Sequence, residues 1–246
     1  MWKEKVAVIT GAASGMGYLA SERFALLGVK IAMLDVNLQA VQAAANTIRE
    51  KGGIADAFSV DIRDYSAVEK SMNQVYEKHG RIDIVINCAG GSSSRVFCRT
   101  EGFRDLPIEV IDWGIDVNLK GQIYMARACI GYMMDQKSGV IINMGSVVGQ
   151  TGSMSIDYST AKSGAMNGLT KSLALYGAPY GVRACCVSPG PVLTRADMAK
   201  MKTPLGRAAE PEEIVDLIEY LCSDKASFIT GANYLIDGGR SCGAKD

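Results

Sequence analysis

The stretch VAVITGAASGMGYLA, residues 6–20, carries the strongest indication of the fold in this sequence. An apolar run with strand character leads directly into a glycine-rich turn, which opens a segment of helical character. Glycines at 11, 15 and 17 free the turn of side chains, so backbone N–H groups and a helix N-terminus can approach a pyrophosphate. The spacing G-x-x-x-G-x-G differs from the common G-x-G-x-x-G but meets the same physical requirement. We therefore predict a dinucleotide site at Gly11, Gly15 and Gly17.

Strand-like and helical segments alternate along the rest of the chain. The expected strands are 6–10, 30–35, 54–61, 83–90, 139–146, 182–190 and 233–239, and the expected helices are 15–27, 38–51, 65–78, 108–134, 158–177 and 211–222. Several strands are nearly continuous aliphatic runs, which is typical of strands buried on both faces of a parallel sheet. Such alternation predicts right-handed βαβ units. We expect an α/β fold with a doubly wound, parallel seven-stranded sheet, Rossmann-like, in a single domain over residues 1–246.

The composition excludes several classes of function. Lysine plus arginine and aspartate plus glutamate both number 26, so the formal net charge is zero, which argues against nucleic acid or an anionic membrane as the main partner. No apolar run reaches the roughly 18 residues that a membrane span needs. The first expected strand begins close to Met1, so we expect no signal peptide and a cytoplasmic location.

The cysteines and the one histidine do not indicate a metal site. The seven cysteines form no C-x-x-C pair and are scattered along the chain, so we expect reduced thiols. His79 precedes Gly80, which has the character of a helix C-cap. We expect this histidine to interact with the helix dipole or lie at the surface. Ser-His-Asp and histidine–metal chemistry are therefore excluded.

An acidic residue ends the second expected strand, at the edge where ligands bind in such sheets. The Asp35 carboxylate can accept hydrogen bonds from both hydroxyls of an adenosine ribose. The same charge would repel a 2′-phosphate, and neither arginine nor lysine stands at Ala13, Ser14 or Val36 to attract one. We therefore expect NAD rather than NADP as the cofactor.

The ends of the third and fourth strands supply further candidates for cofactor binding. Asp61 and Ile62 follow the third strand, and we expect them to meet the adenine by one polar and one apolar contact. Asn87, Ala89 and Gly90 follow the fourth strand, where small residues would let the backbone pass close to the cofactor.

Tyr158 and Lys162 are four residues apart in a predicted helix, so both side chains lie on one face. Ser146 ends the fifth strand at the same ligand edge. A phenol with a pKa near 10 is a poor base at neutral pH, but a neighbouring ammonium and a positively charged nicotinamide would lower that pKa. We expect Ser146 to hold the substrate oxygen while Tyr158 exchanges its proton.

The motifs TGAASGMG, NCAG, DVNLKG, INMGS, YSTAK, VSPG and ITGANYLIDGG occur in an order that resembles the short-chain dehydrogenase/reductase family over nearly the whole chain. The resemblance implies a Rossmann-like fold, hydride transfer to or from a nicotinamide, and a catalytic tetrad. Its members would be Asn118, Ser146, Tyr158 and Lys162. Asn118 would kink its helix and hold a water in the proton relay, and Lys162 would also bind the nicotinamide ribose. The resemblance further implies cofactor contacts at Ser14, Met16, Gly17, Pro189, Gly190, Val192 and Thr194.

Three segments depart from the family pattern. Cys88 replaces an asparagine of the N-N-A-G motif, which should loosen a local hydrogen bond without affecting the chemistry. The substrate segment 191–207 is short, whereas the segment 91–107 is long and carries several arginines and phenylalanines. We hypothesise that the longer segment takes over substrate contacts, with Gln150 also facing the substrate. An open site suits a bulky secondary alcohol such as a steroid, and the polar residues suit a sugar, a polyol or an oxo-acid equally.

Two rival functions remain open. A 3-oxoacyl-carrier-protein reductase would use NADP and a basic docking surface, which Asp35 and the balanced charge argue against. A dinucleotide-binding regulator without catalysis would lack part of the tetrad, which is complete here. The resemblance also implies a homotetramer, and small residues at Ala161, Ala165 and Gly168 would allow close helix contact between chains.

Overall fold

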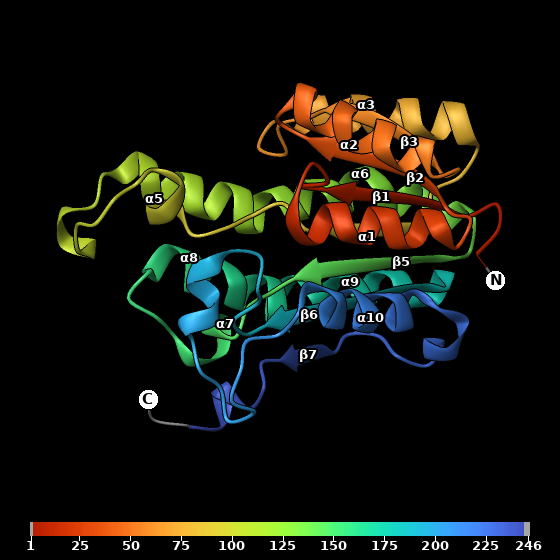
Figure 1. The fold of residues 1–246 in the computed structure, drawn as a ribbon. Coiled ribbons are helices and arrows are strands. Elements are labelled where there is room, and N and C mark those ends of the chain that lie inside the picture. Colours follow the sequence, from red (N-terminus) through yellow and green to blue (C-terminus); the bar gives the residue numbers. More distant parts are fainter. Residues whose placement is uncertain (1, 244–246) are drawn as a thin grey trace.

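Figure 1 shows the computed structural model of the chain, which describes residues 2–243, as a parallel sheet covered by helices on both faces. The seven strands lie in the order β3-β2-β1-β4-β5-β6-β7. Their bounds are β1 Val6–Thr10, β2 Lys30–Asp35, β3 Ile54–Ser59, β4 Ile84–Asn87, β5 Gly139–Met144, β6 Val182–Pro189 and β7 Asn233–Ile236. All neighbouring strands pair in parallel. The predicted α/β class and doubly wound sheet are confirmed.

Two hydrophobic cores, one on each face, hold the helices against the sheet. Helices α1 (Gly15–Leu26), α2 (Leu38–Glu50) and α10 (Pro211–Cys222) pack on one face, and α3 (Tyr65–His79), α6 (Gly121–Asp135) and α9 (Thr170–Gly177) pack on the other. Along β1, Ala7 and Ile9 enter the first core while Val6 and Val8 enter the second. Every residue of β1, β4 and β5 is buried, which is why these strands are continuously apolar in the sequence.

The two long helices near the site each contain a π-helical segment. The helix expected over 108–134 consists of α5 (Ile108–Ile115), a π-segment (Asp116–Lys120) and α6. The helix expected over 158–177 begins earlier, at Ile156, and consists of α8 (Ile156–Ser163), a π-segment (Gly164–Leu169) and α9. Such π-bulges occur often at functional sites, and nothing in the hydrophobic periodicity marks them.

The strands β3 to β7 end earlier at their carboxyl ends than the sequence pattern predicted, whereas β1 and β2 end where expected. Residues such as Asp61, Ala89 and Ser146 therefore lie in the loops just beyond the sheet. Short helices occupy these loops: α4 (Ser93–Val96), η1 (Phe103–Asp105), α7 (Val148–Thr151) and η5 (Ala196–Lys200). In Figure 1 the arrowhead of β5 points toward the side where α5, α7 and α8 gather, so the ligand edge is the one that these loops surround.

The remaining short 3-10 segments lie away from this edge or near the end of the chain: η4 (Ala178–Tyr180), η6 (Asp224–Ala226) and η7 (Arg240–Cys242). Gly80 caps α3 with φ 73°, as its place in the sequence predicted. His79 is not a surface residue, because its Nε2 lies 3.0 Å from an Asp56 carboxylate oxygen and its side chain is only 7% exposed. This pair ties the end of α3 to β3, away from the ligand edge.

Across residues 2–243 all seven cysteines are free thiols, four of them buried as small apolar side chains. The same described part of the chain contains no group of three or more histidine, cysteine, aspartate or glutamate residues placed to hold a metal ion. None of the helices described combines the length and the apolar character that crossing a membrane requires.

Candidate active site

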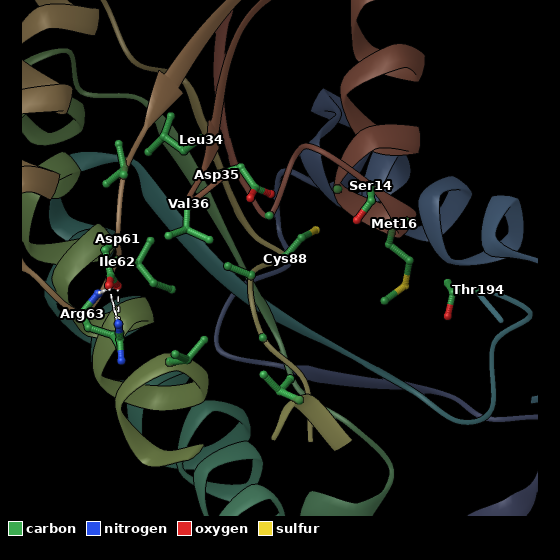
Figure 2. Close-up of a pocket in the computed structure, with 18 of the residues that line it drawn as sticks. Ser14, Met16, Leu34, Asp35, Val36, Asp61, Ile62, Arg63, Cys88 and Thr194 are labelled. Carbon is green, nitrogen blue, oxygen red and sulfur yellow. Dashed lines mark hydrogen bonds and ion pairs between the residues drawn. The ribbon is translucent and has the colours of Figure 1, made fainter. Parts of the chain in front are cut away.

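The larger of two adjoining cavities at the ligand edge has a volume of about 520 Å³ and lies over the carboxyl ends of the first strands. Figure 2 shows Asp35 beside the glycine turn that carries Ser14 and Met16, with the pair formed by Asp61 and Arg63 on one side and Thr194 on the other. Of the predicted cofactor residues, those lining it are Gly11, Ser14, Gly15, Met16, Gly17, Asp35, Asp61, Ile62, Ala89, Gly90 and Thr194.

The glycine turn is closed by backbone contacts that leave no space for side chains. Gly11 has φ +64°, and a Cβ there would lie 2.9 Å from the Cα of Ala89. A Cβ on Gly17 would overlap the carbonyl oxygen of Gly11. The Ala89 N–H donates to the Thr10 hydroxyl at 3.0 Å, which joins the ends of β1 and β4 under the turn. The turn is thus a rigid surface of backbone groups at the start of α1.

We expect Gly17→Ala to weaken binding of the dinucleotide by at least about tenfold, because the added methyl must displace the Gly11 carbonyl and open the turn. Isothermal titration of purified protein with NAD measures the change. Gly52→Ala is the matched control for altering a glycine, since a Cβ there meets nothing within 4 Å, although its φ of +86° adds backbone strain. Unchanged NAD affinity in Gly17→Ala would contradict the assignment of this turn.

Asp35 both shapes the turn and faces the cavity. Its Oδ2 accepts a hydrogen bond from the Ala13 N–H at 3.1 Å, and its Oδ1 accepts one from the Asn37 N–H at 3.0 Å. Each carboxylate oxygen keeps lone-pair capacity for a further donor. The neighbouring Val36 is 70% exposed and also lines the cavity. This end of the cavity therefore offers an anionic acceptor and an apolar surface, which suits a ribose and its base.

Asp61 is engaged by an arginine that the sequence analysis missed. The Arg63 guanidinium donates to both Asp61 oxygens, with Nη2 at 2.6 Å from Oδ2, and lines the same cavity. The pKa of Asp61 is lowered chiefly by this hydrogen-bonded partner. Asp61 therefore faces the cavity as part of an ion pair rather than as the free carboxylate that the sequence analysis expected. The short spacing D-x-R at a strand end was the available signal.

The second cavity, of about 250 Å³, holds the predicted catalytic residues. Its lining includes Ser146, Tyr158, Lys162, Pro189, Gly190, Val192 and Thr194, together with Met16, Cys88 and Gly90. Met16, Cys88, Gly90 and Thr194 line both cavities, so the two adjoin. The thiol of Cys88 stands where the family motif has an amide, and burial raises its pKa to about 12, so it remains protonated and uncharged.

Lys162 is held inside the protein by a single carbonyl. Its Nζ donates to the Met144 backbone oxygen at 2.8 Å, and its ammonium lies 5.6 Å from the centre of the Tyr158 ring. Only 3% of the residue is exposed, and burial lowers the pKa of its ammonium to about 8. The ammonium has two further N–H groups for partners in the cavity that it lines.

The pKa of Tyr158 departs from the expectation. Burial raises the pKa of the phenol, and the groups that oppose this shift are the Ser146 hydroxyl and the charges of Arg95 and Arg195. Among the groups of this chain, burial therefore outweighs those that favour the phenolate.

Asn118 lies in the π-segment and acts as a brace rather than as part of the cavity wall. Its Nδ2 donates to the backbone oxygens of Gly91 and Gly114, each at 2.9 Å, and its Oδ1 accepts from the Gly91 N–H at 2.9 Å. A Cβ on Gly90 would lie 2.6 Å from Asn118 Oδ1 and 3.4 Å from Lys162 Nζ. The side chain therefore fixes the start of the 91–107 segment beside Lys162.

Three predicted site residues do not line either cavity: Asn87, Asn118 and Gln150. Asn87 is buried, and its Nδ2 donates to Asn143 Oδ1 at 3.0 Å. Asn143 Nδ2 in turn donates to the Thr170 hydroxyl at 3.0 Å. These hydrogen bonds tie β4 and β5 to the start of α9. Gln150 is exposed on α7. The sequence places these residues at the right edge of the sheet but does not show which way they point.

The 91–107 segment meets the cavity only through its first residues. Gly91, Ser92 and Arg95 line the cavity that contains Tyr158, whereas Phe97 packs edge-on against Trp113 with ring centres 5.6 Å apart. The Ser93 hydroxyl donates to the buried carboxylate of Asp157, the residue before Tyr158. On the opposite side Arg195 and Met198 from the 191–207 segment line the same cavity.

Comparison with known proteins agrees with this arrangement. A sequence model of the family described as enoyl-(acyl carrier protein) reductase matches residues 11–241. The meso-2,3-butanediol dehydrogenase of Serratia marcescens is 37% identical over 96% of this chain and 94% of its own. The chain belongs to the short-chain dehydrogenase/reductase family. The D-threitol dehydrogenase of Mycolicibacterium smegmatis is 34% identical over 96% of this chain and 92% of its own.

A solved relative places a ligand in the same fold. The crystal structure of a 3-oxoacyl-[acyl-carrier protein] reductase from Brucella melitensis, which contains bound NAD, matches with a TM-score of 0.89 and 29% identity over 97% of this chain and 92% of that one. The predicted family is confirmed, and this short-chain dehydrogenase/reductase is an oxidoreductase acting on CH–OH groups.

The chain's own residues fit a nicotinamide dinucleotide. The turn at Gly11 and Gly17 offers backbone groups where a Cβ would collide with backbone, and Asp35 keeps acceptor capacity beside it. The first cavity leads into the second, where Lys162 has free donors and Pro189 and Gly190 form a wall. The glycine turn would hold the pyrophosphate, and Asp35 and Lys162 would each hold one of the two riboses. Pro189 and Gly190 would lie against the nicotinamide.

Proposed function

We propose that this short-chain dehydrogenase/reductase uses NAD to interconvert a small secondary alcohol and its ketone. The observation that carries the proposal is the meeting of Ser146, Tyr158 and Lys162 in one cavity that opens into the dinucleotide cavity. The similarity to dehydrogenases named for butanediol and threitol supports a small alcohol rather than a steroid.

The residues support a proton transfer coupled to movement of a hydride. A bound nicotinamide would supply the acceptor or donor of the hydride at the substrate carbon. The Ser146 hydroxyl orients the substrate oxygen by a hydrogen bond, and Tyr158 takes the hydroxyl proton during oxidation or returns it during reduction. Lys162 holds a ribose hydroxyl with its free N–H groups. Since burial raises the pKa of Tyr158, we expect alcohol oxidation to accelerate as the pH rises.

The function is tested by a substrate panel in which NAD and NADP are each offered with secondary alcohols, diols and hydroxy acids. We expect reduced nicotinamide to form with NAD and at least one small alcohol. No turnover with any member, together with tight NAD binding, would favour a non-catalytic regulator. Strong preference for NADP would contradict the interpretation of Asp35. Preferred turnover of a 3-oxoacyl thioester would favour the 3-oxoacyl-carrier-protein reductase alternative, which the Brucella melitensis relative supports by name.

We expect Asp35→Asn to move the cofactor preference toward NADP by about tenfold or more, because it removes the charge that repels a 2′-phosphate but keeps the shape. The amide that replaces the carboxylate offers one acceptor oxygen in place of two, so only one of the Ala13 and Asn37 N–H groups keeps its hydrogen bond. NAD affinity is therefore titrated beside the cofactor ratio, so that a loosened turn is told apart from a changed preference. The ratio of kcat/KM for NAD to that for NADP measures the effect, with Asp216→Asn on α10 as a control for removing an exposed acid. An unchanged ratio would contradict the proposed role of Asp35.

The proposed assembly is a homotetramer, but two of the small residues expected at its helix contacts are not at the surface. Ala161 and Ala165 are fully buried within the chain, so they cannot form contacts between subunits. Gly168 is exposed on the same face of the molecule as Leu175 and Tyr176, of which Leu175 is 80% exposed. Light scattering with size-exclusion chromatography measures the mass, and a monomer would contradict the proposal.

A further inference from the structure

The cavity that contains Tyr158 is lined by basic residues without any acidic one. Its charged lining residues in the described part of the chain are Arg95, Lys162 and Arg195. The chain as a whole carries zero net charge, so this concentration of positive charge is local. A cavity lined by one sign of charge attracts ligands of the opposite sign.

Neither arginine at this cavity is neutralised by the protein. Within residues 2–243, no carboxylate lies within ion-pair distance of Arg95 or Arg195, and no protein oxygen accepts a hydrogen bond from either guanidinium. The one polar contact is from Arg195 Nη2 to Met198 Sδ at 3.6 Å. By contrast, Arg63 and Arg99 nearby are both paired with acids. The two guanidinium groups are thus available for an anionic ligand.

Arg95 lies where the two cavities meet, since it lines both. Its Nη2 lies 2.8 Å from where a Cβ of Gly91 would stand, so the guanidinium folds over the backbone that Asn118 braces. Gly91 precedes α4 and lines the cavity that contains Lys162 and Tyr158, so Arg95 is placed to reach a substrate there. Both arginine charges are close enough to lower the pKa of Tyr158.

We propose that the substrate of this enzyme carries a carboxylate close to its reacting carbon, held between Arg95 and Arg195 while its oxygen meets Ser146 and Tyr158. The proposal rests on the proposed function and narrows its substrate to short 2- or 3-hydroxy acids and the corresponding oxo-acids. A guanidinium binds a carboxylate through two parallel hydrogen bonds, which fixes orientation as well as charge. The cavity of about 250 Å³ sets a small size for this substrate.

Arg95 and Arg195 are then specificity-determining residues on opposite segments. Arg95 belongs to the long 91–107 segment, and Arg195 belongs to the short 191–207 segment, directly after Thr194. A carboxylate between them would draw the two segments together over the substrate. Both arginines also line the larger cavity, so the pyrophosphate of the cofactor is the other anion that they are placed to bind. NAD affinity in the arginine variants distinguishes a pyrophosphate from a substrate carboxylate.

The test compares hydroxy acids of three to five carbons with their primary amides as substrates. We expect the wild-type enzyme to prefer the acids, and Arg95→Gln to reduce kcat/KM for the acids by about 10- to 100-fold while changing the amides by less than about threefold. Arg195→Gln should act in the same direction, and Arg95→Lys should lose less. Arg99→Gln, which alters the same segment at an ion pair with Glu101, should change neither. NAD affinity by titration should stay unchanged in the variants.

Three results would overturn the proposal: wild-type preference for the amides or for neutral diols, equal losses on acids and amides in Arg95→Gln, or weakened NAD binding that accounts for the loss. Turnover of neutral diols alone would leave the proposed function standing and remove this inference. If no alcohol is turned over, calorimetry with 2-hydroxy-2-methylpropanoate, which has no hydride to lose, decides separately. If this acid binds the wild-type protein but not Arg95→Gln, the carboxylate site is supported although the reaction is not. If it does not bind the wild-type protein, the proposed carboxylate site is wrong.

Discussion

Tyr158→Phe should reduce kcat for alcohol oxidation by about 10³-fold while NAD still binds. The change removes the oxygen that exchanges the substrate proton, and it keeps the ring that lies near Lys162 and lines the cavity. General acid–base groups contribute about 10²- to 10⁴-fold in enzymes. The chain's one histidine lies on α3, where it contacts Asp56.

The measurement is single-turnover formation of reduced nicotinamide at saturating NAD, with NAD affinity titrated separately. Tyr176→Phe is the matched control, because Tyr176 lies on α9 and is 61% exposed away from the cavity. The control should retain full activity. A Tyr158→Phe enzyme that keeps more than about a tenth of the wild-type rate would show that the proton leaves by another route.

The fold and the ligand edge could be predicted from the sequence because they depend on periodicity. The buried aliphatic runs of β1, β4 and β5 have no alternation to misread, and the glycine turn follows β1 directly. The ends of β3, β4, β5, β6 and β7 were placed too late by one to three residues, since a polar residue after an apolar run is equally compatible with strand and loop. That uncertainty falls on the residues that form the site.

The electrostatics of the site could not be predicted, because they depend on pairs distant in the sequence. The sequence shows Tyr158 and Lys162 four residues apart, but it does not show that burial raises the pKa of the phenol or that Ser146, Arg95 and Arg195 from three other segments oppose this shift. Likewise Asn118 is recognisable as a motif residue, yet only the structure shows that its amide is fully used in bracing Gly91 and Gly114. Direction of side chains and desolvation are properties of the packed chain.

Lys162→Met should inactivate the enzyme and, at neutral pH, make it more stable. We expect kcat/KM to fall by about 10²-fold or more, because the free N–H groups beside Tyr158 are lost. The stability gain comes from the buried charge, since burial lowers the pKa of Lys162 to about 8 from its usual value near 10.4. A shift of that size corresponds to about 3 kcal/mol of unfolding free energy.

Part of that gain is offset by the loss of the hydrogen bond from the charged ammonium to the Met144 oxygen, worth about 2 kcal/mol. Gln122 Nε2 still donates to the same oxygen at 3.2 Å, so the carbonyl is not left unpaired. A net increase of about 1 kcal/mol is therefore expected at pH 7, measured by urea unfolding without cofactor. Lys171→Met on α9 controls for removing an exposed lysine and should change stability by less than about 0.5 kcal/mol.

The pH dependence distinguishes this cause from ordinary improvement of packing. Below pH 8 the lysine is protonated in both folded and unfolded states, so the full cost of burying the charge is present and constant. Between pH 8 and about 10.4 the unfolded chain binds the lysine proton more strongly than the folded chain does. The free energy of unfolding of the wild type therefore rises with pH in this window, whereas the variant, which lacks the lysine, shows no such rise. The difference between the two proteins should therefore shrink across this window. A variant that is less stable than wild type at pH 7, or a difference that stays constant up to pH 10, would show that the protein does not hold Lys162 as a desolvated ammonium.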